Sequence, residues 1–406
     1  MNYYLHIPFC RQKCPYCKFA LTPIFTELKK RRYIEYLKKE IREYFLEQNP
    51  PASSVGTPPS QGGIGTIYFW WGTPSILTLD EVGSILECFP ILSPWGESWS
   101  EVTFECNPED ITTEYVAWLL DLWINRLSIG VQSLSNRTLK AIHRSNKKSI
   151  FYALENIYSS LLSFSERESL SEKDRSSAIA KDDKIVPWIS LNVDFILGLP
   201  YSKPWETFAD IRELHEAFPY ITHTSVYMLE DGHYPKDWKW ESITEEEMQV
   251  EYRMICEYFD SIGWHHYEIS NWSRPGYESV HNQGYWNHTN TRAFGLSGTN
   301  YVDGRRWTNA SSFSGYYTGK NESEEILNGQ EIHLEKIIHW LRTFSLSTSG
   351  FSPKILRELE KNGDINIIDG KIILTPAWIF RENFILGELV DEGSSEKYSK
   401  TSISRI

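Results

Sequence analysis

Three cysteines near the N-terminus are the residues in this sequence best suited to chemistry. Cys10, Cys14 and Cys17 form a C-x3-C-x2-C pattern, so one short loop carries three thiols. A closed structural zinc site takes four ligands, whereas three thiolates and a water suit a catalytic zinc. A [4Fe–4S] cluster usually takes four thiolates, so three would leave one iron open to a substrate. Three unconnected core cysteines are the remaining interpretation, which this close spacing disfavours.

A predicted strand and a predicted helix flank the cysteine loop. Residues 3–7 are aromatic and apolar, which predicts a buried strand ending just before the first cysteine. Apolar residues then recur at helical spacing from Ile34 to Phe45, among lysines and glutamates, which predicts an amphipathic helix.

Strands and helices alternate over the following part of the chain. Apolar or β-branched runs predict strands at Thr66–Phe69, Val102–Cys106, Arg126–Val131, Ile189–Leu197 and Ser225–Leu229. Helices are predicted between them at Leu79–Leu92, Thr113–Leu122, Asn136–His143 and Thr207–Phe218. This alternation indicates βαβ units and a parallel sheet in the α/β class. A partial or full TIM-type (β/α) barrel is expected, with its functional face at the carboxyl ends of the strands.

Composition and pattern divide the chain into a partial barrel, an aromatic- and glycine-rich extension, a small C-terminal domain and a frayed tail. The C-terminal domain is predicted to be helical or winged-helix-like, with a short hairpin at Ile365–Leu374. Two polar segments inside the barrel are predicted to be surface loops. The four parts are residues 1–230, with loops at 49–65 and 163–184, then 231–320, 321–390 and 391–406.

The overall composition excludes several functional classes. The 406 residues include 41 Lys and Arg against 54 Asp and Glu, a net charge of −13, which disfavours nucleic acid as a partner. No apolar run approaches the roughly 20 residues of a membrane span. The first residues lack the basic and apolar regions of a secretory signal. The other cysteines are scattered, so free thiols and a cytoplasmic location are expected.

The cysteine motif resembles that of the radical S-adenosylmethionine (SAM) superfamily. There the open iron binds the amino and carboxylate groups of SAM, and reductive cleavage yields a 5′-deoxyadenosyl radical. More narrowly, YLHIPFC and the following CPYCKF resemble the oxygen-independent coproporphyrinogen III oxidase family. Its dehydrogenases carry a further cysteine where this chain has Phe19, so the sequence is more similar to the haem-chaperone, HemW-like branch. The resemblance extends from Tyr3 to about Leu386.

The resemblance implies a SAM site built from successive strand ends. The WWGTPS loop would contact the SAM amino group, and Arg144 would neutralise the carboxylate. Glu105 and Asp194 would face the ribose, and Tyr16 would pack near the adenine. Each residue alone has an ordinary explanation, as a satisfied carboxylate or a surface base, but together they are hard to attribute to chance. The implied SAM-binding residues are Tyr4, Tyr16, Gly72, Thr73, Glu105, Gln132, Arg144 and Asp194.

A second motif, HNQGYW, matches the HNxxYW pattern of the chaperone branch and implies haem as cargo. His281 is the predicted haem ligand, because neutral imidazole is a usual axial ligand of haem iron. A hydrogen-bonded core histidine is the alternative, and His265 and His266 are weaker candidates. The implied partners are a recipient haemoprotein and, if SAM is cleaved, an electron donor such as flavodoxin or ferredoxin.

Two other functions remain open from the sequence. One is the oxidative decarboxylation of coproporphyrinogen III to protoporphyrinogen IX, against which the missing fourth cysteine argues. The other is a binding protein with a purely structural metal site.

Tryptophan stands at several positions where the family pattern leads us to expect glycine. A backbone that passes close to a ligand, or takes a positive φ, accepts glycine and resists an indole. Two adjacent indoles in the WWGTPS loop are expected to collide with the cofactor. Either the protein has lost SAM binding, or UGA codons that the source reads as glycine were translated as tryptophan. We favour the second explanation, since one residue type recurs, at Trp70, Trp71, Trp123, Trp205, Trp340 and Trp378.

Overall fold

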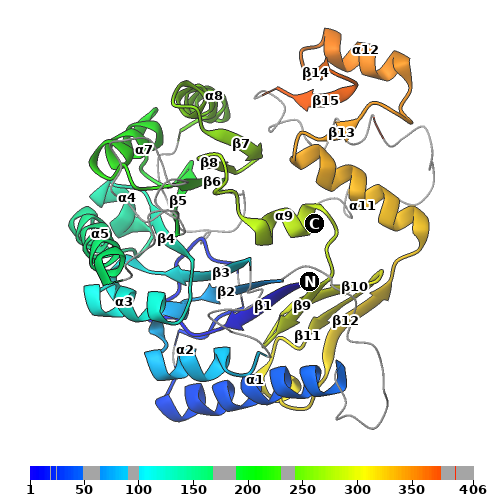
Figure 1. Ribbon diagram of the computed structural model, residues 1–406. Coiled ribbons are helices and arrows are strands. Elements are labelled where there is room, and N and C mark those ends of the chain that lie inside the picture. The colour runs from blue at the N-terminus through cyan, green and yellow to red at the C-terminus, as the bar shows by residue number, and fades with distance from the viewer. Residues whose placement is uncertain are drawn as a thin grey trace.

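A single curved sheet of twelve strands organises the molecule in the computed structural model (Figure 1). The structure describes residues 1–18, 20–23, 25–48, 65–89, 100–167, 189–229, 243–375 and 389. Within these ranges the sheet is open, with β12 at one edge and β7 at the other. The predicted α/β class with a partial barrel is therefore confirmed.

The centre of the sheet consists of parallel strands joined in the order β9-β1-β2-β3-β4-β5-β6. Strands buried on both faces are typical of parallel sheets covered by crossover helices. Leu5, Phe69, Phe104 and Phe195 accordingly lie wholly inside. The parallel strands are β1 (Asn2–Ile7), β2 (Thr66–Gly72), β3 (Glu101–Cys106), β4 (Arg126–Gln132), β5 (Ser190–Leu197), β6 (His223–Met228) and β9 (Thr291–Phe294).

Antiparallel strands complete both edges. On one side follow β10 (Thr299–Val302), β11 (Arg305–Asn309) and β12 (Asn321–Ile326), and on the other β8 (Asn271–Ser273) and β7 (His265–Glu268). Ion pairs fix the outermost pairing, since Arg305 meets Glu324 at 2.9 Å and Arg306 meets Glu325 at 3.0 Å. The segment 321–326 therefore extends the large sheet. This corrects the expectation that the C-terminal domain begins at residue 321.

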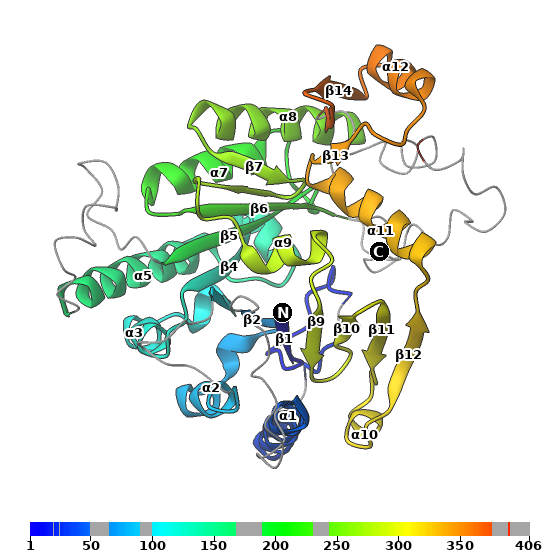
Figure 2. The same cartoon turned by 45° about the vertical axis from the view of Figure 1, so that its right-hand side comes forward.

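Helices follow one another around the outer face of the sheet, as Figure 2 shows. Two of them begin with capping boxes, Thr78 with Glu81 and Thr244 with Glu247, which satisfy amide groups that a helix start leaves without partners. No helix of the described residues has the length and apolar character of a bilayer span. The outer helices are α1 (Glu27–Gln48), α2 (Leu79–Leu86), α3 (Thr113–Asp121), α4 (Asn136–Ala141), α5 (Lys147–Arg167), α7 (Glu206–Ala217) and α8 (Glu245–Ser261).

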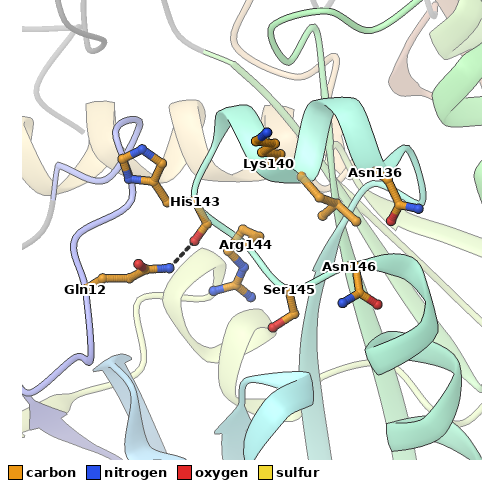
Figure 3. A pocket seen from close by; sticks show the side chains of 8 residues that line it. Gln12, Asn136, Lys140, His143, Arg144, Ser145 and Asn146 are labelled. Carbon is orange, nitrogen blue, oxygen red and sulfur yellow. Dashed lines mark hydrogen bonds between the residues drawn. The ribbon is translucent and has the colours of Figure 1, made fainter.

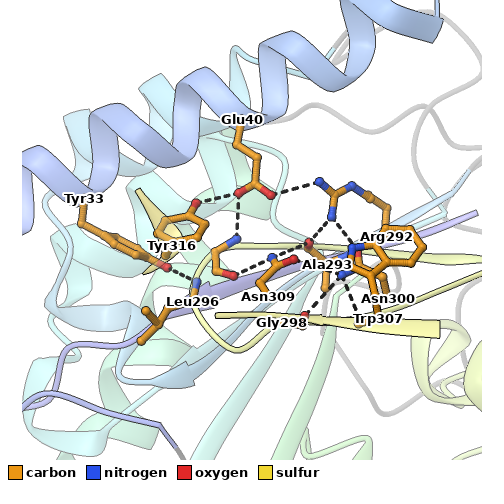
Figure 4. Close-up of polar contacts among 11 residues, drawn as sticks. Tyr33, Glu40, Arg292, Ala293, Leu296, Gly298, Asn300, Trp307, Asn309 and Tyr316 are labelled. Atoms are coloured by element: carbon orange, nitrogen blue, oxygen red, sulfur yellow. Dashed lines mark hydrogen bonds and ion pairs between the residues drawn. The ribbon is translucent and has the colours of Figure 1, made fainter. Parts of the chain in front are cut away.

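A buried polar network attaches α1 to the β9 edge of the sheet (Figure 4). Glu40 accepts hydrogen bonds from Arg292 at 3.0 Å, from the Gly295 amide at 3.0 Å and from the Tyr316 hydroxyl at 2.6 Å. Tyr33 donates to the carbonyl of His6 at 2.7 Å. These contacts fix the loop after β9 against the strand that leads into the cysteine loop.

The C-terminal part has a core of its own, formed by α12 (Pro353–Lys361), the last turns of α11 (Gly329–Arg342) and a three-stranded sheet. Its strands are β13 (Leu346–Ser347), β14 (Ile365–Ile368) and β15 (Lys371–Leu374), so the expected hairpin is present. Three shorter elements complete the described structure: α9 (Val280–Trp286), α10 (Phe313–Tyr316) and two 3-10 turns at Pro74–Ile76 and Pro108–Asp110.

Two expected loops meet the structure only in part. The helix α5 runs through residue 167, so the segment 163–167 is helical, while the rest of 163–184 lies outside the described residues. Residues 49–64, the helix end expected at 90–92 and the tail at 391–406 also lie outside them.

Two of the anomalous tryptophans have a backbone that suits glycine. Trp123 has φ +62 and Trp205 has φ +68, in the left-handed region that bulky residues rarely adopt. Both indoles are exposed, at 49% and 39%. Trp340 lies within a helix, and Trp378 lies outside the described residues. The backbone at Trp123 and Trp205 therefore agrees with glycine in the natural protein.

Replacing either residue by glycine is expected to stabilise the protein. Trp123→Gly and Trp205→Gly each relieve the left-handed strain, and should raise the free energy of unfolding by about 0.5 to 1 kcal/mol. Trp118→Gly is the matched control, because Trp118 is 53% exposed within the α3 helix. The control should lose about 1 kcal/mol. Urea titrations in which all three variants lose stability alike would contradict the glycine interpretation.

Candidate functional site

The carboxyl ends of the parallel strands open into a cavity of about 1920 Å³. Side chains from six successive strands and their following loops line it, as expected for the functional face of such a sheet. All of the predicted site residues line this cavity except His281. Those brought together are Tyr4, Cys10, Cys14, Tyr16, Cys17, Gly72, Thr73, Glu105, Gln132, Arg144 and Asp194.

The cysteine loop is closed at its base and held against the end of β1. Phe9 and Thr22 form an isolated bridge, and the amide of Cys10 donates to the carbonyl of Thr22 at 3.3 Å. His6 lies 2.9 Å from the carbonyl of Ala20 through Nε2. Burial lowers the pKa of His6 to about 4, so its ring is neutral near pH 7. His6 therefore positions the loop from inside the sheet.

The three thiols line the cavity from one side. The Thr73 hydroxyl donates to Cys10 Sγ at 3.3 Å, and the Asn107 amide donates to the Thr73 hydroxyl at 3.2 Å. Burial raises the pKa of the Cys10 thiol to about 11. Among the described residues, no three donor side chains converge closely enough to hold a single metal ion. The donor set is thus three sulfurs distributed along one loop.

Arg144 supplies the positive charge beside this loop. It donates to Asn107 Oδ1 at 2.8 Å and to the carbonyl of Gly130 at 2.5 Å. Burial opposes its charge, but the neighbouring Tyr16 and Cys14 raise its pKa. Gly130 is required here, because a Cβ at that position would lie 2.4 Å from the Arg144 guanidinium.

A small hollow of about 580 Å³ lies outside Arg144 (Figure 3). Gln12 of the cysteine loop crosses it and donates from its side-chain amide to the carbonyl of His143. Arg11 of the same loop pairs with Asp110, which follows β3. The loop is therefore connected to the segments that carry Arg144 and Asn107.

Two carboxylates approach the cavity from neighbouring strands. Glu105 on β3 accepts a hydrogen bond from the Tyr68 hydroxyl at 3.4 Å. Asp194 on β5 accepts from Ser128 at 3.0 Å and from Asn192 at 2.8 Å. Burial raises the pKa of Asp194, although these hydrogen bonds oppose the rise. Both carboxylates are held in fixed positions by side chains of the sheet.

Two irregular strand ends shape the cavity wall. Gly72 ends β2 with φ +67, and a Cβ there would lie 2.0 Å from the carbonyl oxygen of Ile7. Gln132 ends β4 with φ +69, where the register with β5 shifts. Strained residues of this kind concentrate at functional sites.

Trp70 is the anomalous tryptophan that reaches the cavity. Its indole packs on Tyr4, with ring centroids 6.0 Å apart, and on Tyr68, with centroids 4.8 Å apart. The register of β1 with β2 passes from Trp70 directly to Gly72, so Trp71 forms a bulge. The expected conflict with a cofactor therefore concerns Trp70.

His281 differs from the expectation. It is wholly buried, with Nδ1 2.6 Å from the Thr66 hydroxyl and Nε2 2.9 Å from the Tyr285 hydroxyl. Burial lowers its pKa to about 3. Both ring nitrogens are thus engaged in the core, which is the alternative that the sequence left open. The weaker candidates His265 and His266 are likewise not among the residues that line the cavity.

Several lining residues were missed by the sequence reasoning. Asn107 stands inside the FECNP motif, two residues after Glu105, so the motif itself held the signal. His288 and His339 also line the cavity, from the turn after α9 and from α11. No motif marks them, and only the fold brings them together.

Comparison with known proteins agrees with this geometry. Residues 4–162 match the model of the radical SAM superfamily. The haem chaperone HemW of Lactococcus lactis is 27% identical over 84% of this chain and 80% of its own length. HemW of Bacillus subtilis is 24% identical over 96% of this chain and 99% of its own length. The coproporphyrinogen III oxidase HemN of Escherichia coli, a radical SAM enzyme, has the same fold, with a TM-score of 0.71 at 16% identity over 96% of this chain and 89% of its own.

The fold and the matched domain define the class: this chain belongs to the radical SAM superfamily. Within it, the HemW relatives place the chain on the HemW-like branch of the oxygen-independent coproporphyrinogen III oxidase-like family.

The close approach at Gly72 gives a stability test. Gly72→Ala meets both an unfavourable φ and a backbone oxygen, and is expected to lose about 2 to 4 kcal/mol of unfolding free energy. Gly319→Ala is the matched control, because Gly319 has φ +66 but no heavy atom lies within 4 Å of the place that its Cβ would take. The control should lose only about 1 kcal/mol. Equal losses in urea denaturation would show that β2 does not press against Ile7.

Proposed function

We propose that this protein is a haem chaperone that binds haem and delivers it to a recipient haemoprotein, with a [4Fe–4S] cluster and SAM. The observation that carries the proposal is the single cavity of about 1920 Å³. Sites for one drug-sized ligand are typically ~300–1,000 Å³. The cavity has room for a nucleotide and for a second large ligand beside it.

Cys10, Cys14 and Cys17 are the proposed ligands of the cluster. Three thiols on one loop fit a cluster that leaves one iron open, and the hydrogen bond from Thr73 to Cys10 is of the kind that tunes such clusters. Bound there, the cluster would supply an iron for the amino and carboxylate groups of SAM and an electron for its cleavage. Binding would also require the Cys10 thiol to lose its proton.

The surrounding side chains are proposed to orient SAM. Arg144 would pair with the SAM carboxylate, because its charge is fixed beside the cysteine loop. Glu105 and Asp194 would accept hydrogen bonds from the ribose hydroxyls, and Tyr16 would cover the adenine. The remaining proposed contacts are Tyr4, Gly72, Thr73 and Gln132, which line the same wall.

The opposite lining suits a porphyrin. Tyr285, Trp286, Tyr301, Leu334 and Ile338 offer aromatic and aliphatic surface, which a flat apolar macrocycle requires. We place this function in the cytoplasm, with a recipient haemoprotein as partner. Flavodoxin or ferredoxin would donate the electron if SAM is cleaved.

Oxidative decarboxylation of coproporphyrinogen III is the second candidate. The fold similarity to the Escherichia coli oxidase favours it, whereas Phe19 in place of a fourth cysteine argues against it. Anaerobic incubation of the reconstituted protein with coproporphyrinogen III, SAM and a reductant distinguishes the two. Formation of protoporphyrinogen IX over many turnovers would favour the oxidase.

Haem transfer tests the proposed function. Anaerobically reconstituted protein is expected to bind about one haem per chain, seen as a Soret band in a titration, and to pass it to an apo-haemoprotein. The reconstituted protein without haem is the control for carry-over. A protein that shows no saturable Soret change would contradict the proposal.

A further inference from the structure

Two histidines line the cavity as a pair, although they are far apart in the sequence. His288 follows α9 and His339 lies on α11, and their ring centroids are 4.5 Å apart with an interplanar angle of 35°. Trp286 packs against His339 at 5.5 Å, edge to face. We call His288 and His339 the histidine pair.

Each ring of the histidine pair has one nitrogen without a hydrogen-bond partner. Within the part of the chain that the structure describes, Nε2 of His288 and Nδ1 of His339 are buried and unpaired, as is the indole nitrogen of Trp286. Buried polar atoms without partners are rare in native proteins and call for an explanation, such as an ion. Three of them in one cluster beside a large cavity indicate a site that another group completes.

The other nitrogen of each ring is occupied. His288 makes a hydrogen bond with the backbone of Glu335, and His339 makes one with the backbone of Tyr285. Both contacts raise the pKa of the ring, as an accepting carbonyl does, while burial lowers it, for His339 to about 3. Each ring is therefore neutral and donates its one proton to the backbone. The unpaired nitrogen keeps its lone pair, which is the arrangement of metal-ligating histidines.

Charged and flat side chains surround the histidine pair. Arg342 lies 5.6 Å from the Trp286 ring centroid, and Arg306 is held by Glu325 and Glu335 at 3.0 and 2.6 Å. Both arginines line the cavity. Guanidinium groups bind carboxylates well, and haem carries two propionates. The surroundings thus offer a metal donor, an aromatic face and cations together.

Packing alone would also bring two imidazoles and an indole into contact. It does not explain why all three leave a polar atom buried without a partner, because core histidines are normally hydrogen-bonded on both nitrogens. His281 illustrates this normal case, with Thr66 and Tyr285 as its two partners.

We propose that the histidine pair, and not His281, supplies the imidazole ligand to the iron of the haem cargo. The inference rests on the proposed chaperone function and assigns the residues that hold its cargo. Both free nitrogens are shielded from solvent, so iron reaches them only after the rings move apart. His281 then has a structural role, between β2 and α9.

Haem titration of three variants tests this inference. The double variant His288→Gln/His339→Gln is expected to bind haem about tenfold more weakly or worse and to lose the spectrum of imidazole-ligated iron. His281→Gln should keep that spectrum. His333→Gln is the matched control, since His333 is exposed on the same helix as His339. Iron and sulfide content and far-UV circular dichroism should be the same in every sample.

A second set of variants keeps the test decisive if the double variant folds poorly. Single His288→Gly and His339→Gly variants are titrated with and without added imidazole. Recovery of the wild-type spectrum on addition of imidazole to either would support the assignment. A wild-type spectrum in both single variants without imidazole, or loss of imidazole ligation in His281→Gln alone, would overturn it. If wild-type protein bound no haem at all, the proposed function itself would fail.

Discussion

The site depends on one constraint, the parallel register that brings the carboxyl ends of neighbouring strands to the same edge of the sheet. β1 and β2 are paired from Asn2 with Thr66 to His6 with Trp70, and the pairing then breaks at a bulge that ends on Gly72. Because only glycine fits against the carbonyl of Ile7, the end of β2 can reach the base of the cysteine loop. The contact from Thr73 to Cys10 follows from that approach.

The same edge collects the polar groups that the rest of the sheet excludes. His6 holds the cysteine loop through the carbonyl of Ala20, and Arg144 is fixed by Asn107 and the carbonyl of Gly130. Each of these groups is satisfied by a neighbouring strand end, so the wall near the thiols is rigid before any cofactor binds. Beside α9 and α11 the situation is reversed, since buried nitrogens there lack partners. One wall is therefore complete in itself, and the other is arranged for a guest.

The sequence predicted the strands and outer helices well, because period and composition are local. It also identified the residues near the thiols, since their motifs lie directly at strand ends. It did not predict the helix through residue 167 or the place of residues 321–326, which depends on ion pairs with Arg305 and Arg306. His281 was misjudged as an open ligand because a motif does not reveal burial. His288 and His339 meet only in three dimensions. For Trp123 and Trp205, the expectation of glycine agrees with the positive φ that the structure gives them.

The central claim is that three cysteines hold a cluster whose open iron faces SAM. Electron paramagnetic resonance of the reduced, anaerobically reconstituted protein tests it most directly, recorded with and without SAM. The account predicts a [4Fe–4S] signal that changes when SAM is added, and no such signal in Cys17→Ser, while Cys256→Ser resembles the wild type. A full cluster signal in Cys17→Ser, or a wild-type protein that holds zinc and no inorganic sulfide, would contradict it.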